Sequence, residues 1–424
     1  MSNQTEQAEI VRRSLKGRYR KERRFRAYGI LAIALALAAL VVLFADIIGK
    51  GHTGFLKTTI TLDVEMDSEA MYLEDPTNSD EVRMADFVEP LIVSLAEMLP
   101  DATVDDRDQL RGLVNAYSSN QLRDELVASP QWMGTTQTIT FLANSDVDVY
   151  VKHKDDDAYS IKLSEQQREW VDELEQRGII ETRFNDVFFT SGDSRDPARA
   201  GVLGAIVGSL LVMFVTLALS FPIGVAAAIY LEEFAPKNKF TDFIEVNINN
   251  LAAVPSIIFG LLGLAVFINL FGMPRSAPFV GGLVLTLMTL PTIIISSRAA
   301  IKSVPPSIRQ AAEGVGASKM QVVLHHVLPL AMPGMLTGSI IGMAQALGET
   351  APLLLIGMVA FVVEIPDGFF DGATALPVQV FLWAGSPESG FIERASAAIM
   401  VLLAFLMSMN ALAIWLRKRL ERRW

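Results

Sequence analysis

The chain has 424 residues, of which 51% are hydrophobic, and it carries a formal net charge of −11. It has no cysteine, which excludes disulfide cross-links. The sequence also lacks a G-x-x-x-x-G-K-[ST] phosphate loop, a metalloprotease motif and a nucleophile elbow, so it indicates neither a nucleotide hydrolase nor a common hydrolase.

Most apolar residues fall into long blocks, and a block of about 20 apolar residues is long enough to cross a bilayer as a helix. Six such blocks predict six membrane spans, at 27–48, 200–230, 244–271, 279–297, 332–362 and 395–416. The first block is too long for a signal peptide and no clear small-x-small cleavage site follows it, so we expect a retained anchor.

Lysine and arginine predict the orientation, because they concentrate on the cytoplasmic side of membrane proteins. The basic stretch "VRRSLKGRYRKERRFR" precedes the first block, and "RKRLERRW" follows the last. We therefore expect both termini in the cytoplasm. The expected organisation is a basic cytoplasmic N-terminus (1–26), an anchor helix (27–48), a periplasmic domain (51–198), a permease core (200–416) with a cytoplasmic loop at 298–329, and a basic cytoplasmic tail (417–424).

Residues 51–198 are long enough for a small domain. They hold 31 Asp and Glu against 12 Lys and Arg, a balance of −19, which leaves +8 for the rest of the chain. "VDDRDQLRGLVNAYSSNQLRDELVAS" and "LSEQQREWVDELEQRG" predict helices, the second beginning after Ser164 and ending near Gly178, whereas "VDVYVK" predicts a strand. We expect a mixed α/β module. The acidic run at 155–157 is interpreted as a solvated turn because it lacks the spacing of a calcium loop.

A polar segment, "QAAEGVGASKMQVVLHHVLP", separates the fourth and fifth blocks. Ser307-x-x-Gln310 and Ser318-x-x-Gln321 both have the form of a capping box, and Gly316 suits a turn between two helices. The pattern predicts a short helix from Ser307 to about Val315, a sharp turn, and a second helix that enters the next span. These signals are equally compatible with a simple hairpin between spans and with a docking element.

The same segment resembles the EAA loop of ABC importer permeases. The matching residues are Gln310-Ala311-Ala312, Gly316 and His326-Val327-Leu328-Pro329, with glutamine and histidine where the family has glutamate and isoleucine. In that family the loop forms the coupling helix, which sits in a cleft of the ATPase subunit. The residues that this resemblance assigns to coupling are Gln310, Ala311, Ala312, Glu313 and Gly316.

Four further stretches are similar to the phosphate-specific ABC permeases of PstA type: "NINNLAAVPSIIFGLLGLAVF", "LMTLPTIIISSRAAIKSVP", "ALGETAPLLLIG" and "TALPVQVFLWAGSPES". The resemblance covers most of residues 200–420. It implies an α-helical membrane protein with the six-helix fold of ABC importer type I permeases. The implied partners are a sister permease of PstC type, a dimer of PstB-type ATPase subunits that bind Mg-ATP, a periplasmic phosphate-binding protein of PstS type, and the lipid bilayer. No cofactor, metal or nucleic acid is expected on this chain.

Polar residues inside the fourth block are candidates for a translocation path. Thr286, Thr289, Thr292 and Ser296 recur at helical spacing and either line a path or bond the carbonyls of their own helix near Pro291. Arg298, at the end of this block, is a candidate site for phosphate or for lipid headgroups.

Glu349, in "AQALGETAPLL", is a carboxylate in the fifth block, where an unpaired charge is costly. The family pattern places an arginine one turn earlier, and this chain has Gln345 there. Three arrangements remain open: an arginine from the sister permease, a protonated carboxyl, or hydrogen bonds from Gln345 and Thr350. The candidate path therefore comprises Gln345, Glu349, Thr350, Thr289, Ser296 and Arg298.

Other functions predict features that the sequence lacks. An ion-coupled secondary transporter commonly contains inverted repeats, and a receptor would carry a cytoplasmic output domain. Another oxyanion, such as sulfate or molybdate, remains an alternative substrate. His325 and His326 are adjacent on a predicted helix and point in different directions, which disfavours a metal site.

Overall fold

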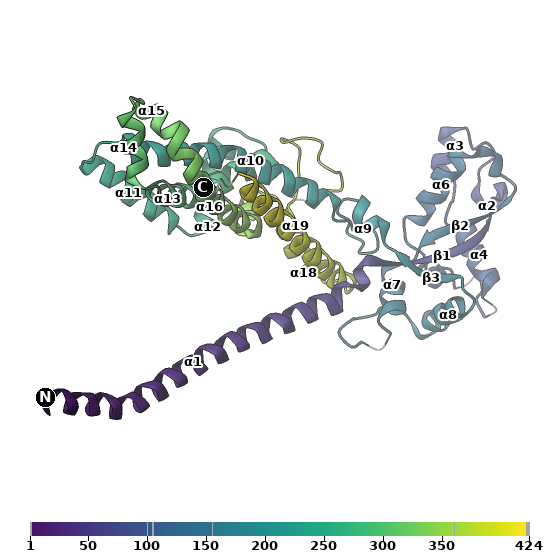
Figure 1. Cartoon of the computed structure of the whole chain (residues 1–424). Helices are drawn as coiled ribbons and strands as arrows, with labels where there is room; N and C mark the ends of the chain where they lie inside the picture. Colours follow the sequence, from purple (N-terminus) through teal and green to yellow (C-terminus); the bar gives the residue numbers. More distant parts are fainter. Residues whose placement is uncertain (1, 100, 104–105, 155, 360, 421–424) are drawn as a thin grey trace. The chain divides into compact units, whose positions relative to one another are not determined.

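The first hydrophobic block lies within one long helix, α1 (Ser2–Gly51). The computed structural model describes residues 2–99, 101–103, 106–154, 156–359 and 361–420. The chain divides into two units, Met1–Lys50 and Gly51–Trp424, and α1 makes up the first. The second unit contains a mixed α/β insert at residues 51–198, referred to below as the insert, and a helical core at residues 203–420 (Figure 1).

A three-stranded antiparallel sheet forms the centre of the insert. The strands β1 (Leu56–Glu65), β2 (Thr136–Leu142) and β3 (Ile180–Phe184) have the order β2-β1-β3, with Ile60 opposite Phe141 and Leu62 opposite Ile139. In β1 the buried residues 60, 62 and 64 alternate with more exposed ones, as in a strand with one buried face. Threonine and isoleucine, which favour strands, make up much of β1 and β2.

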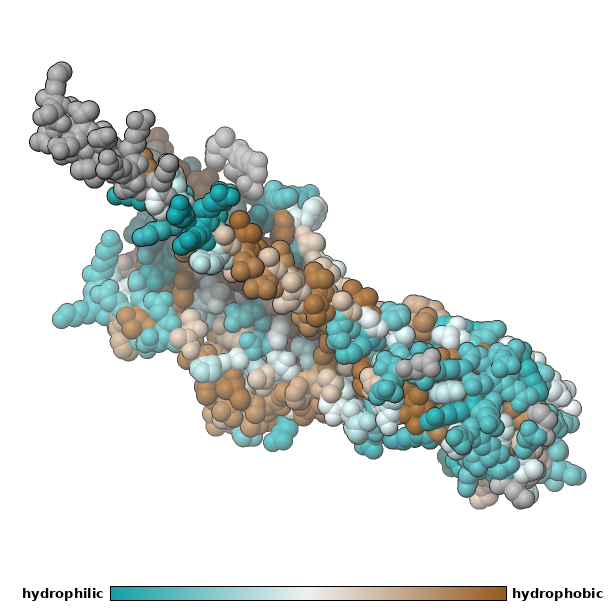
Figure 2. Space-filling view, turned by 90° about the horizontal axis from the view of Figure 1, so that it is seen from below, coloured by the Kyte–Doolittle hydropathy of each residue, from teal (hydrophilic) through white to brown (hydrophobic). Residues whose placement is uncertain are grey.

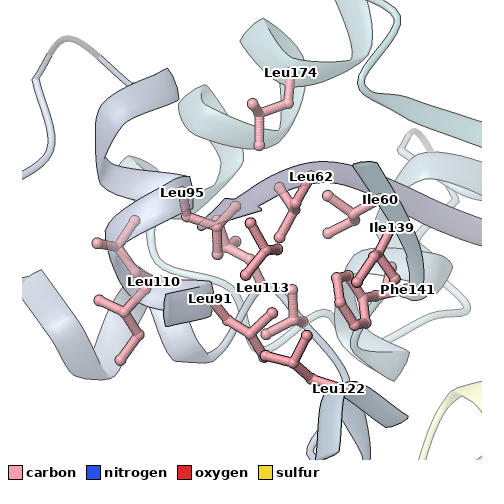
Figure 3. Packing of buried hydrophobic residues seen from close by; sticks show 14 of the residues in the cluster. Ile60, Leu62, Leu91, Leu95, Leu110, Leu113, Leu122, Ile139, Phe141 and Leu174 are labelled. Atoms are coloured by element: carbon pink, nitrogen blue, oxygen red, sulfur yellow. The ribbon is translucent and has the colours of Figure 1, made fainter. Parts of the chain in front are cut away.

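Helices cover this sheet and supply most of the insert's hydrophobic core. Figure 3 shows leucine side chains, including Leu91, Leu95, Leu122 and Leu174, gathered around Ile60 and Leu62 of β1. The helices and short turns of the insert are η1 (Thr53–Phe55), α2 (Ser68–Met71), α3 (Ser79–Met84), α4 (Glu89–Met98), α5 (Arg107–Arg111), α6 (Ser118–Ala128), η3 (Pro130–Trp132), α7 (Ser145–Lys152), α8 (Glu165–Gln176) and α9 (Asp186–Thr190).

Local signals predict one part of the insert correctly and another wrongly. Helix α8 begins with a complete capping box at Ser164, and Gly178 follows its end with a φ of +72°, so both expectations are confirmed. The expected strand "VDVYVK" is wrong, because these residues belong to α7. Asn144 caps α7, and the Asp148–Lys152 ion pair spans four positions, a spacing that brings side chains together only on a helix.

The core consists of long apolar helices and shorter connecting ones. Its elements are α10 (Leu203–Ile229), η4 (Tyr230–Phe234), α11 (Lys239–Ala252), α12 (Ser256–Leu262), η5 (Gly263–Leu270), α13 (Pro278–Lys302), α14 (Pro306–Gly314), α15 (Lys319–Val322), η6 (Val323–Val327), α16 (Leu328–Gly348), α17 (Ala351–Leu355), α18 (Leu376–Ala384) and α19 (Gly390–Leu420). On the face drawn in Figure 2, hydrophobic side chains gather over the core, whereas hydrophilic side chains cover most of the insert.

Among the described residues, five helices are long and apolar enough to cross a membrane, and a bent pair makes a sixth if it crosses as one. The bent pair corrects the expectation of a continuous third span. Helix α11 and the segment from Ser256 to Leu270 meet at an angle of 102°. Pro255 lies at this bend, where it supplies no backbone donor and disfavours a helical conformation for the residue before it.

The fifth span also differs from the expectation that it extends over 332–362. Helix α16 ends at Gly348, and Glu349 has an extended backbone, with φ −80° and ψ 119°. The next helix, α17, begins only at Ala351. A continuous helix would need an amide at position 352 to bond the carbonyl of Gly348, and Pro352 has none, so the helix breaks there.

Glycines allow two long helix pairs of the core to pack closely. A Cβ at Gly282 of α13 would lie 2.4 Å from the Cβ of Val215 in α10. A Cβ at Gly338 of α16 would lie 1.9 Å from the hydroxyl of Ser296 in α13. Helices α10, α13 and α16 therefore pack through small residues, as is common in membrane proteins.

A buried ion cluster joins the insert to the first turn of α19. Glu393 and Arg394 are fully buried there. The Lys152 Nζ lies 3.0 Å from a Glu393 oxygen and 2.7 Å from Asp148, and the His153 Nε2 lies 3.2 Å from the second Glu393 oxygen. Arg394 lies 3.6 Å from Asp148. Asp148 and Glu393 thus balance Lys152 and Arg394 in a buried site, which fastens α7 of the insert to α19.

We expect Glu393→Gln to weaken this junction, because the substitution leaves an uncompensated positive charge in a buried site, at a cost of about 3–5 kcal/mol. The purified chain in detergent should show a lower apparent Tm and faster proteolysis of the insert. Glu181→Gln is the matched control, because Glu181 pairs with Arg183 at the surface, where an ion pair contributes about 0–1 kcal/mol. Equal thermal stability of the two variants would contradict this account.

Candidate functional site

Helix α14 and the turn after it are built by local sequence signals. Pro305 and Pro306 start the helix, with Pro306 at its first position, so the expected capping box at Ser307 is wrong: Ser307 already lies inside the first turn. Gly316 has a φ of +90°, and the amides of Gly316 and Ala317 donate to the carbonyls of Glu313 and Ala312. This hydrogen-bond pattern ends α14 in a sharp turn.

The second capping box is confirmed. The Ser318 hydroxyl accepts the Gln321 amide at 3.4 Å, and the Gln321 side chain accepts the Ser318 amide at 2.9 Å. Helix α15 then continues through the π-helical turn η6 into α16. The expected helix–turn–helix that enters the next span is therefore present, and α14 and α15 lie at one end of the core (Figure 1).

The two faces of α14 differ. Ala312 is buried against a cluster that includes Val304 and Val322, whereas Gln310, Ala311 and Glu313 are exposed. Beyond the helix, Val315 is 86% exposed and Met320 is 54% exposed. Within the described residues, Glu313 forms no ion pair. The outer face of this segment therefore presents polar and apolar groups that no described part of the chain covers.

Arg309 fastens the inner side of α14 to the core. Its guanidinium donates to Glu233 of η4 at 2.7 Å and to the carbonyls of Val304 and Ile301 at 2.7 and 3.0 Å. These carbonyls lie at the end of α13, where helix termini leave acceptors unsatisfied. Arg309 thus ties α14 to the ends of both α10 and α13, and a displacement of α14 would pull on both helices.

Arg298 lies in a second set of charges beside this anchor. It is buried, its Nε lies 2.5 Å from Glu232, and it also bonds Glu245 of α11. Lys302 contacts Glu232 at 3.2 Å. Two carboxylates, those of Glu232 and Glu245, thus pair with the Arg298 guanidinium in this conformation. Arg298 therefore links α13 to its neighbouring helices. To bind an anion it would first have to break these ion pairs.

The hydroxyls of α13 bond the carbonyls of their own helix. Thr286 donates to Gly282, Thr289 to Leu285 and Ser296 to Thr292, at 2.7–2.9 Å. Thr286 and Thr289 are buried, and Ser296 packs against Gly338 as described above. The structure therefore places Thr289 and Ser296 at the contact between α13 and α16.

Glu349 lies at the break between α16 and α17. Glu349 and Thr350 are half-buried and Gln345 is exposed. Among the described residues the Glu349 carboxylate has no hydrogen-bond or ion-pair partner, so the structure does not contain the arrangement with hydrogen bonds from Gln345 and Thr350, one of the three left open by the sequence. Gly348 beside it has open space around its α-carbon, which leaves room for a group from outside the chain.

The predicted site residues fall into separate groups. The five coupling residues share one short segment, at 310–316. The path residues do not converge, because α13 and α16 run antiparallel: Thr289 lies near Gly342 and Ser296 near Gly338. Arg298 is therefore at one end of this helix pair and Glu349 at the other.

Sequence reasoning did not assign roles to Arg309, Glu232, Glu233 and Glu245. A signal was available, since "YLEEF" ends one apolar block on the same predicted side of the membrane as Arg298 and Arg309. No group of three or more His, Asp or Glu side chains in the described part of the chain is placed to hold a metal ion.

Two families match the chain. Residues 220–424 match the family "binding-protein-dependent transport system inner membrane component", and residues 12–160 match a domain of unknown function, DUF3333. The second match covers most of α1 and a large part of the insert.

Curated relatives are similar to part of this chain. The probable ABC transporter permease protein YqgI of Bacillus subtilis (strain 168) is 34% identical over 178 residues, which are 42% of this chain and 59% of that protein. The probable ABC transporter permease protein YqgH of the same strain is 32% identical over 219 residues, 50% of this chain and 69% of YqgH. Phosphate transport system permease protein PstA 1 of Mycobacterium tuberculosis (strain CDC 1551 / Oshkosh) is 29% identical over 223 residues, 53% and 72% of the two chains.

We expect Gly316→Ala to loosen the turn after α14, because an L-residue with a left-handed backbone costs about 1–2 kcal/mol. Hydrogen exchange of the Gly316 and Ala317 amides should become about 5- to 30-fold faster. Gly314→Ala is the matched control, since an added Cβ meets nothing within 4 Å at either position and only Gly316 has a positive φ. The same exchange rates in both variants would argue against a turn that depends on Gly316.

Proposed function

Because the chain belongs to the family of binding-protein-dependent transport system inner-membrane components, the permeases of ABC transporters, we propose that it is a permease subunit of an ATP-driven phosphate importer. In this role it forms the translocation path together with a sister permease of PstC type. The resemblance to PstA-type permeases that the sequence predicts is confirmed by the curated relatives. The protein is thus a multi-pass inner-membrane permease and not a catalytic enzyme.

One observation carries the coupling part of this proposal: α14 has an uncovered outer face and an anchored inner side. Gln310, Ala311 and Glu313 are exposed, while Arg309 bonds Glu233 and the end of α13. A partner that binds the outer face and then moves would transmit its motion to α10 and α13. An ATPase dimer of PstB type, which binds Mg-ATP, is the partner we propose, since this sequence has no phosphate loop of its own.

The charge distribution supports an orientation. Basic residues flank the first and last apolar blocks, and the α14 segment lies beside Arg298, Lys302 and Arg309. We place both termini and α14 in the cytoplasm, and the acidic insert and the loop after α17 in the periplasm. A periplasmic phosphate-binding protein of PstS type would then deliver substrate to the periplasmic side of the core.

Among the candidate path residues, Glu349 is the one to which we assign a specific role in transport. It lies at a helix break, half-buried and without an internal partner among the described residues. Broken helices in transporters expose backbone dipoles to substrate or ions, and an ionisable residue at such a place is a functional candidate. We propose that a basic side chain of the sister permease pairs with Glu349 and that the pair opens during transport.

The function is tested by reconstituting the chain with the sister permease, the ATPase subunits and the binding protein in proteoliposomes. We expect uptake of labelled phosphate that requires ATP on the cytoplasmic side. Sulfate and molybdate are measured in parallel. Preferential uptake of sulfate or molybdate would identify that anion, instead of phosphate, as the substrate. Uptake without ATP would reject the ABC mechanism.

In the same system we expect Glu349→Gln to reduce phosphate uptake at least about tenfold, because loss of a desolvated charge pair removes more than about 1.4 kcal/mol. Co-purification of the partner subunits should be unchanged. Glu69→Gln, an exposed position in the insert, serves as the matched control. Normal uptake by Glu349→Gln would assign Glu349 to helix packing.

A further inference from the structure

A pocket of about 680 Å³ lies where the chain passes from the insert into α10. It is lined by residues 190–196 and 199, which follow the insert's last strand, and by residues 361 and 363–365 from the loop after α17. A backbone contact joins the two walls: the Asp193 amide donates to the Val362 carbonyl at 3.2 Å. The pocket therefore belongs to the same end of the core as the insert junction.

Two arginines line this pocket, and each lies over an aromatic ring. The guanidinium carbon of Arg199 is 3.7 Å from the centre of the Tyr117 ring, and that of Arg195 is 5.4 Å from the centre of the Phe361 ring. Within the part of the chain that the structure describes, neither guanidinium forms an ion pair or a side-chain hydrogen bond. A stacked guanidinium keeps its N–H donors in its own plane, where they match the oxygens of a phosphate.

Two of the three carboxylates that line the pocket, Asp193 and Asp196, accept hydrogen bonds from other parts of the chain. Asp196 accepts hydrogen bonds from Asn115, from Ser145 and, at 3.1 Å, from the Ala198 amide. Asp193 accepts from the Trp383 indole and from the Ser194 amide, both at 2.9 Å. Burial raises the pKa of the Asp193 carboxyl, and these two hydrogen bonds and the Gln379 side chain oppose the rise. Glu364 is exposed at the rim.

Side chains from the folded part of the insert hold the segment at residues 190–199 in place. Asn115 and Ser145 hold Asp196, and Tyr117 supports Arg199, so three insert residues position the segment that carries both arginines. Ser191 and Ser194 also line the pocket. The Ser194 oxygen accepts the Asp196 amide at 3.1 Å, which leaves its O–H available as a donor.

We propose that Arg195 and Arg199 form an oxyanion-binding subsite at the mouth of the permease, which receives phosphate before it enters the core, and that the insert positions Arg199 through Tyr117. The choice of phosphate as the anion rests on the proposed function. The anion accepts hydrogen bonds from both guanidinium groups, with the Ser191 and Ser194 hydroxyls as further donors. The insert thereby acquires a role in transport, as the support of a binding loop.

Phosphate binding is tested on the purified full chain in detergent, without its partners. Phenylglyoxal, which modifies arginine, is applied with inorganic phosphate or with chloride at equal ionic strength, and modified residues are identified by mass spectrometry. We expect phosphate to slow modification of Arg195 and Arg199 at least several-fold and to leave Arg183, an exposed residue paired with Glu181, unaffected. Equal protection by phosphate and chloride overturns the proposal.

Transport by the reconstituted complex tests the consequence. Arg195→Gln and Arg199→Gln should each lower phosphate uptake at limiting substrate about tenfold. The Arg→Lys variants should show intermediate uptake, because lysine keeps the positive charge but lacks the planar guanidinium with its paired N–H donors. Tyr117→Phe keeps the stacking ring and should transport normally, whereas Tyr117→Leu should resemble Arg199→Gln. Arg183→Gln is the matched control. Parental uptake by both arginine variants, in a complex whose parent transports phosphate, overturns the subsite alone. A parent complex without phosphate uptake overturns the proposed function, and the labelling experiment still decides whether the pocket binds phosphate.

Discussion

Hydrocarbon offers no hydrogen-bond partner to a peptide group, and this constraint shapes the whole core. The apolar segments therefore form helices that bond within themselves, and glycines bring these helices together. Two breaks, before α12 and before α17, interrupt the pattern. Non-helical backbone within a membrane is stable only where protein covers it or water reaches it. The two broken segments meet, since a Cβ at Gly260 of α12 would lie 2.7 Å from Pro352 of α17. Glu349 thus lies at one of two helix breaks whose segments pack against each other.

Charges fasten the core at two places. Near α14, Arg309 and Arg298 join the ends of α10 and α13, and Arg298 also links them to α11. At the start of α19, Glu393 and Arg394 join the insert to the core. Removing one member of such a set leaves the opposite charge buried and unpaired. These links therefore make rigid connections, which a transporter needs if a movement at α14 is to reach the other end of its helices.

The sequence predicted the turn after α14 and the start of α15 well because the signals there are local. The Ser318 capping box and the turn at Gly316 both depend on residues within a few positions of one another. The partners of Arg309 were not predictable in this way, since Glu233 is 76 positions away. Arg298 illustrates the same limit, because its position suggested an anion site and its neighbours in space are two carboxylates.

The sequence by itself determined which segments are apolar enough to span a membrane, where α8 and α15 begin, and which permease family the chain resembles, because composition, capping and motifs are properties of neighbouring residues. Only the tertiary structure decided that residues 147–152 form a helix, since Lys152 meets Glu393 there and Asp148 meets Arg394. It also decided which helices break and which charges pair. Those outcomes depend on contacts between segments distant in the chain, whose free energies exceed the local preferences.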